Sequence, residues 1–159
     1  MKSSKILNKE LINAIAAMGH TDLMIVCDAG FPIPKDAWRV DLALIQDVPD
    51  LETVLTAISS EMIVENVAYA SEMAENNPPL LEKVQKIFHA SNHETIPHQQ
   101  ILGEMAAKAK VIIRTGAFDP WGNILLYGGV DAPIWFSKPG VKVPEVYAER
   151  VRQMKEGEA

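Results

Sequence analysis

Short apolar runs alternate with amphipathic stretches along the chain. The run Leu23–Cys27 is continuously apolar, which is typical of a strand buried on both faces. Similar runs predict strands at 40–45, 111–114 and 123–127, a strand at 62–68 where a helix is the alternative, and one short strand within the loop at 91–96. Apolar residues at helical spacing predict helices at 9–18, 51–59, 80–88, 97–108 and 144–154. This alternation predicts a layered α/β fold in which helices flank a mainly parallel sheet.

Polar residues mark several of the predicted helix ends. Asn8 and Asp50 stand in N-cap positions before two of the helices. Gly19 suits the C′ position that ends the first helix. His20 therefore lies in the turn between the first helix and the first strand.

Two candidate functional groups flank the first strand, His20 before it and Asp28 after it. A loop that leaves the carboxyl end of a buried strand is where open α/β sheets usually bind ligands, and Asp28 lies in such a loop. A strand rises ~3.3 Å per residue, so the two side chains lie about 17 Å apart and cannot share a pocket within one subunit unless the chain bends. Either they belong to different sites, or a second subunit brings a copy of one to the other.

The composition fits a globular protein and excludes several partners. The chain has 159 residues, enough for one domain with a sizeable core. Its net charge of −6 argues against nucleic acid, and no apolar stretch approaches the ~20 residues of a membrane span. The N-terminus lacks a signal peptide's apolar centre, so we expect a cytoplasmic protein. The single cysteine, Cys27, excludes an internal disulfide and is interpreted as a buried strand residue.

The sequence changes character near residue 130. Three prolines and a glycine make 131–144 irregular. We therefore expect a domain at 1–130 and a C-terminal extension at 131–159. An exposed Trp135–Phe136 pair would be costly in a monomer, so we expect the extension to pack on the domain or on a neighbouring subunit.

Three histidines raise the question of a metal site. His89 and His93 have the i,i+4 spacing of ligands on one helix, and His98 follows closely. However, Asn92 and Pro97 argue against one helix carrying both ligands, and no cysteine or tight carboxylate cluster completes a site. We expect no metal.

Several motifs, in order, resemble the D-ribose pyranase and L-fucose mutarotase family. Each motif is short, but their order and spacing along one chain make the resemblance strong, and it covers most of residues 5–130. The motifs are Gly19-His20-Thr21-Asp22, an apolar strand followed by Asp28-Ala29-Gly30, and the segments 31–34, 39–44, 111–116 and 120–126.

The resemblance implies a monosaccharide mutarotase or pyranase, nearer to the ribose type, that interconverts cyclic forms of a free sugar by acid–base ring opening without a cofactor. It implies that His20 is the proton donor. It also implies that Asp28, His98 and Asn123 hold sugar hydroxyls, with Trp121 packed on the sugar's C–H face.

Two residues of the implied site depart from the ribose type. Trp121 stands where the family normally has tyrosine, and Gly122 resembles the fucose type. An indole keeps a flat apolar wall but lacks the phenol oxygen. Gly122 permits close approach of the backbone to a ligand. These differences predict an altered sugar preference.

The resemblance also implies an octameric or decameric ring with pockets at subunit contacts, which would unite His20 and Asp28. Two alternatives stay open: a non-catalytic monosaccharide-binding accessory protein of a sugar transport system, and a metal-dependent sugar isomerase. Anomer exchange measured with and without protein separates the first alternative from an enzyme, and chelation tests the second.

Overall fold

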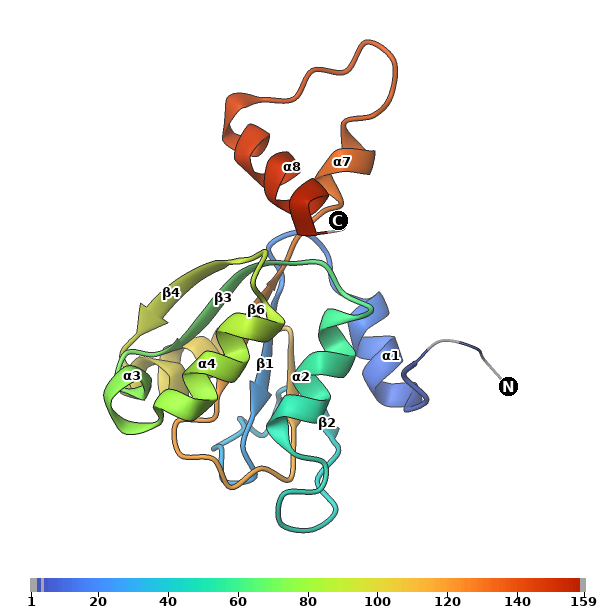
Figure 1. Cartoon of the computed structure of the whole chain (residues 1–159). Helices are drawn as coiled ribbons and strands as arrows, with labels where there is room; N and C mark the ends of the chain where they lie inside the picture. Colours follow the sequence, from blue (N-terminus) through green and yellow to red (C-terminus); the bar gives the residue numbers. More distant parts are fainter. Residues whose placement is uncertain (1–2, 4, 158–159) are drawn as a thin grey trace.

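A computed structural model describes residue 3 and residues 5–157, and its strands form one six-stranded sheet in the order β2-β5-β1-β6-β3-β4 (Figure 1). The strands are β1 (Leu23–Cys27), β2 (Arg39–Asp41), β3 (Val64–Ala70), β4 (Asn92–Ile96), β5 (Val111–Arg114) and β6 (Ile124–Gly128). β6 pairs antiparallel with β1 and with β3, whereas the other three pairs are parallel. The predicted mainly parallel sheet is therefore confirmed.

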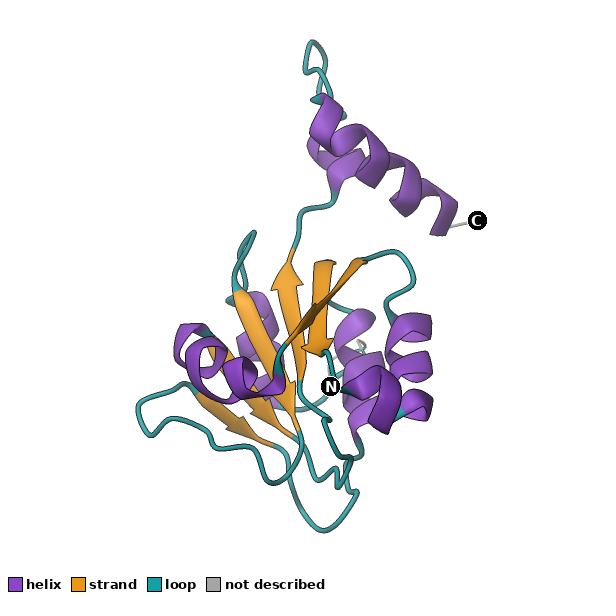
Figure 2. Cartoon of the chain, turned by 90° about the vertical axis from the view of Figure 1, so that its left-hand side faces the viewer, coloured by secondary structure: helices purple, strands orange, loops and turns teal. Residues whose placement is uncertain are grey.

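Helices cover both faces of this sheet, as Figure 2 shows in edge view. Side chains of α1, α2 and α4 pack in an apolar cluster on one face, and those of η1 and α6 pack in a second cluster on the other face. The layered α/β fold predicted from the sequence is confirmed. The helices are α1 (Lys9–Ala16), α2 (Leu51–Ser59), α3 (Met73–Asn76), α4 (Pro78–Ile87), α5 (His98–Gln100), the π-helical turn η1 (Ile101–Met105), α6 (Ala106–Lys108), α7 (Ala132–Trp135) and α8 (Glu145–Gly157).

The central strand β1 contributes to both apolar clusters. Met24 and Val26 belong to the cluster that faces α1, α2 and α4, whereas Leu23, Ile25 and Cys27 belong to the cluster on the opposite face. Successive side chains of a strand point to opposite faces, so a strand covered on both sides must be apolar throughout. Burial also raises the pKa of the Cys27 thiol to about 12, which keeps it protonated and unreactive.

The predicted N-caps are confirmed, but the end of α1 differs from the prediction. Asn8 Oδ1 accepts from Leu11 N at 2.9 Å, and Asp50 caps α2 in the same way. The helix α1 ends at Ala16, so the prediction that Gly19 is its C′ residue is wrong. Gly19 instead starts a turn that is closed by the side chain of Asp22.

Several other predicted elements have different bounds. The strand predicted at 40–45 ends at Asp41. The chain turns out of the sheet there, and the Asp41 carboxylate accepts from Ala43 N at 3.2 Å within this turn. The segment predicted at 97–108 is helical but is divided by the π-turn η1. The ambiguous segment at 62–68 is the strand β3 from Val64 onward.

The residues after β6 form an extension of α7, a loop and α8 at the end of the sheet where β1 begins (Figure 1). The side chain of Arg150 in α8 is only 7% exposed. Its guanidinium donates to the carbonyl of Val64 at 3.1 Å and to the carbonyl of Ala90. Within the described residues, no helix is long and apolar enough to span a membrane.

Candidate functional site

His20 and Asp28 lie at opposite ends of β1, as the sequence predicts. In Figure 1, β1 runs away from the extension, so its first residue is near α7 and α8 and its last residue is at the far end of the sheet. The structure therefore contains two separate groups of candidate residues within one chain, one around each of these side chains.

A carboxylate holds the turn that carries His20. Asp22 Oδ2 accepts from Gly19 N at 2.7 Å, and the Lys110 ammonium also bonds to that carboxylate. The hydrogen bond from Lys110, together with that from Gly19, keeps the pKa of Asp22 below its ordinary value. Thr21 has φ 68°, a left-handed conformation that is rare for a β-branched residue, and its N–H donates to Gly128 O at 2.8 Å. The turn is thereby fixed on the end of β6.

The imidazole of His20 is held by a carboxylate from another strand. His20 Nε2 lies 3.1 Å from Oε2 of Glu65, which belongs to β3. A carboxylate partner selects the tautomer and orientation of an imidazole, which is an arrangement used for proton transfer. No pattern near Glu65 in the sequence indicates this role, since the two residues are 45 positions apart.

The Asp28 loop is organised around its own carboxylate and around Asn123. Asp28 Oδ1 accepts from Gly30 N at 2.8 Å, and Asp28 N donates to Asn123 Oδ1 at 3.2 Å. Burial raises the pKa of Asp28, while hydrogen bonds from Gly30 and Asn123 and the charge of His98 oppose that shift. Asp28 and Asn123 are therefore neighbours at the carboxyl end of β1.

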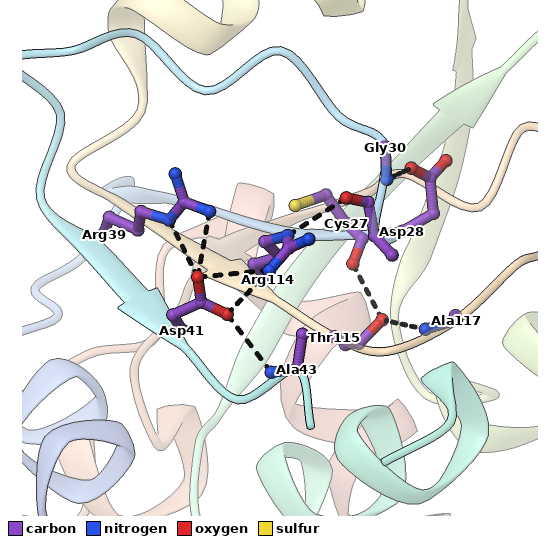
Figure 3. A network of polar contacts seen from close by, with 10 residues as sticks. Cys27, Asp28, Gly30, Arg39, Asp41, Ala43, Arg114, Thr115 and Ala117 are labelled. Carbon is purple, nitrogen blue, oxygen red and sulfur yellow. Dashed lines mark hydrogen bonds and ion pairs between the residues drawn. The ribbon is translucent and has the colours of Figure 1, made fainter. Parts of the chain in front are cut away.

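Thr115 ties the Asp28 loop to the sheet (Figure 3). Its hydroxyl donates to Cys27 O at 2.8 Å and accepts from Ala117 N at 3.1 Å. The residue is fully buried, so both of these bonds satisfy backbone groups that water cannot reach. The backbone on both sides of Thr115 is thus fixed relative to the end of β1.

Arg114 makes a second connection beneath the same loop (Figure 3). Its Nε donates to Ala29 O at 3.0 Å, and its Nη1 pairs with Asp41 Oδ1 at 3.2 Å. Arg39 pairs with the same carboxylate at 2.9 Å. Burial acts to raise the pKa of Asp41, but the Ala43 N–H and the two arginines hold it below the ordinary value. Arg114 is not among the functional residues predicted from the sequence, although it lies inside the segment 111–116 that carries part of the resemblance.

His98 presents an unpaired nitrogen at this end of the sheet. Its backbone N–H donates to the Glu72 carboxylate at 3.1 Å, which fixes the start of α5. Its Nδ1 is buried and has no hydrogen-bond partner in the described part of the chain. A buried nitrogen without a partner is costly, but solvent does not reach this atom, so the imidazole must turn before Nδ1 can meet a ligand hydroxyl.

The segment Trp121-Gly122-Asn123 joins the loop after β5 to β6. Trp121 has φ 57° and packs partly buried against both apolar clusters. A Cβ at Gly122 would lie 2.7 Å from Asp119 O and 3.4 Å from Leu51 Cδ2. The packing of the loop itself therefore accounts for the glycine, whereas the sequence suggested approach to a ligand.

The histidines considered for a metal site are not placed on one helix. α4 ends at Ile87, before His89, and His93 lies in β4 with its Nε2 3.0 Å from Phe88 O. Residue 3 and residues 5–157 contain no group of three or more His, Cys, Asp or Glu side chains placed to hold a metal ion.

Comparison with known proteins finds one family. Residues 1–131 match the model of the RbsD / FucU transport protein family. D-ribose pyranase 1 of Streptomyces griseus is 54% identical over 151 residues, which are 95% of this chain and 100% of that protein. D-ribose pyranase 2 of Rubrobacter xylanophilus is 55% identical over 150 residues, 94% of this chain and 97% of the relative.

Two solved structures share the fold. Bacillus subtilis RbsD complexed with D-ribose superposes with a TM-score of 0.77 and 33% identity, covering 82% of this chain and 98% of that one. The Streptococcus pneumoniae fucose mutarotase in complex with L-fucose has a TM-score of 0.70 and 18% identity, covering 82% and 99% of the two chains. The second similarity concerns the fold alone.

We predict that Gly122→Ala lowers the free energy of unfolding by about 1–3 kcal/mol, because the new Cβ overpacks the loop. Gly103→Ala is the matched control, since a Cβ there meets nothing within 4 Å and alanine favours helix. Urea denaturation followed by circular dichroism measures both variants. Equal stability of the two would contradict the packing role of Gly122.

Proposed function

This chain belongs to the RbsD / FucU transport protein family, and we propose that it is a monosaccharide isomerase of the D-ribose pyranase type. The observation that carries the proposal is its 54% identity to a D-ribose pyranase over 95% of the chain. The proposed substrate is free D-ribose or a closely similar aldose.

The proposed reaction needs only proton transfer. A base removes the proton of the anomeric hydroxyl, and an acid protonates the ring oxygen as the C1–O bond breaks. The resulting aldehyde rotates about C1–C2 and closes again on either face. Closure by a different hydroxyl exchanges pyranose for furanose. No electrons or groups leave the sugar, so the reaction requires no cofactor.

We assign proton donation to His20. Imidazole titrates near neutral pH and can give and take protons. The Glu65 carboxylate at 3.1 Å supports this assignment, because it would hold the ring in one orientation. Glu65 is thus a positioning residue in the proposal.

We assign sugar binding to the group at the other end of β1. Asp28 offers carboxylate oxygens and Asn123 offers a side-chain amide for sugar hydroxyls, and the imidazole of His98 offers a further partner. Trp121 supplies an apolar wall for the C–H face of the sugar, and the backbone at Gly122 completes the loop.

We propose that copies of the chain associate head to tail into a ring, an octamer or a decamer, in the cytoplasm. Large apolar side chains are exposed near both ends of the sheet, with Ile45 and Phe118 near the Asp28 loop and Trp135 and Val146 in the extension. Joining two different surfaces in this way is a heterologous contact, which closes into a ring when the rotation permits. It would also bring His20 of one subunit to Asp28 of the next.

We expect His20→Ala to lower ribose ring-form exchange by ~10²-fold or more, because the proton donor is lost. Saturation-transfer NMR on free ribose measures the exchange, and His89→Ala, at an exposed histidine outside both groups, is the control. Exchange at the wild-type rate in folded His20→Ala protein would remove His20 from the role. Activity that disappears on dialysis against EDTA would favour a metal-dependent isomerase instead.

We expect mixed oligomers of His20→Ala and Asp28→Ala subunits to regain activity that neither variant has alone. In an equal random mixture, about one quarter of the shared pockets receive both native residues, so about a quarter of wild-type exchange should return. Two affinity tags, purified in sequence, identify the mixed oligomers. If neighbouring subunits share one pocket, the mixed oligomers must be active. Inactive mixed oligomers would contradict the shared pocket.

We expect Trp121→Tyr to keep the fold and to shift the relative exchange rates towards ribose. An indole has more apolar surface than a phenol and offers only an N–H donor, so it distinguishes hydroxyls less sharply. Exchange rates for ribose and fucose measured on both proteins give the comparison. Identical sugar profiles would mean that this side chain does not set the preference.

A further inference from the structure

The His20 end of the sheet contains a pocket that is partly built from the extension. The pocket has a volume of about 510 Å³, and the turn at 18–20, the residues just after β6 and the extension all line it. The aromatic residues that the extension contributes are Trp135, Phe136 and Tyr147. The family match ends at residue 131, so these three side chains lie outside the part of the chain that defines the family.

Two aromatic rings of the extension follow one another beside His20, each tilted by about 50° to its neighbour. The ring centroid of Tyr147 is 6.4 Å from that of His20, and the centroids of Phe136 and Tyr147 are 5.3 Å apart. Both separations lie in the range of interacting aromatic pairs. Tyr147 therefore lies next to both the imidazole of His20 and the ring of Phe136.

Arg150 fixes Tyr147 in this place. The two residues are three positions apart in α8, so they lie on the same side of the helix. The Arg150 guanidinium donates to the carbonyls of Val64 and Ala90. Val64 directly precedes Glu65, which bonds His20. The extension is thus seated on the same strand that orients the proposed proton donor.

We propose that the extension forms a wall of the sugar site and that Tyr147 contacts the bound sugar beside His20. The flat face of a phenol ring packs well on the apolar C–H groups of an aldose. Trp121 has the same proposed role in the group around Asp28. This inference rests on the proposed function, and it makes Tyr147 a sugar-binding residue that the family motifs do not contain.

The test compares Tyr147→Ala with Tyr147→Phe in the full-length protein. Loss of the ring should raise KM for ribose about tenfold and change kcat less than about twofold, whereas phenylalanine keeps the ring and should keep KM. Arg152→Ala is the matched control, because its side chain makes only exposed ion pairs on the same helix. Ring-form exchange is followed by saturation-transfer NMR over a range of ribose concentrations.

A second measurement reports binding without catalysis. Ribose is titrated while the imidazole C–H signals of His20 are recorded, and the dissociation constant should rise for Tyr147→Ala in parallel with KM. Tyr147→Leu keeps apolar packing within the extension but lacks a flat ring. It should therefore weaken ribose binding similarly, even if Tyr147→Ala does not fold.

The outcomes separate this inference from the proposed function. Unchanged KM in Tyr147→Ala and Tyr147→Leu, or a fall in kcat alone, would overturn the proposal that Tyr147 contacts the sugar. An equal rise of KM in Tyr147→Phe would also overturn it, since the ring would then not be the contact. A wild-type protein that binds ribose but does not exchange its ring forms would overturn the proposed catalysis. The titration would still measure the contribution of Tyr147 to binding in that case.

Discussion

The arrangement of the whole site depends on the burial of β1 on both faces. Its side chains enter two separate apolar clusters, so the strand has no surface left for polar groups. Chemistry can therefore be placed only at its two ends, in the His20 turn and in the Asp28 loop. A rigid five-residue strand keeps these ends apart, and this separation is the reason why the proposed function invokes a neighbouring subunit.

Each end of β1 is held by charged or polar groups that come from distant parts of the chain. At the first end, Lys110 bonds Asp22 and Glu65 bonds His20. At the second end, the Arg114 side chain reaches the carbonyl of Ala29. These contacts hold the side chains and the backbone of the two loops in place. Groups that are held in advance orient a substrate at a smaller entropic cost. The sheet thus holds the two loops in place at its opposite ends.

The extension changes the surroundings of only one of these ends. It seats Arg150 on the first residue of β3 and places an aromatic ring beside His20, while the Asp28 loop lies at the far end of the sheet. A sugar bound between two subunits would thus meet the extension from the His20 side and Trp121 from the Asp28 side. In the proposed site, this division would let a chain keep the family's polar residues and still differ in the apolar surfaces around the sugar.

The sequence by itself determined the elements whose signal is local. The apolar run at 23–27 predicted a doubly buried strand, because burial on both faces removes the polar alternation. The caps at Asn8 and Asp50 were recognisable, because each side chain bonds a backbone N–H only three residues away. The ordered motifs around His20 and Asp28 indicated the family. The tertiary structure alone decided which strands are neighbours, and hence that Glu65 meets His20. Periodicity describes which face of a strand is buried, but it carries no information about strand order.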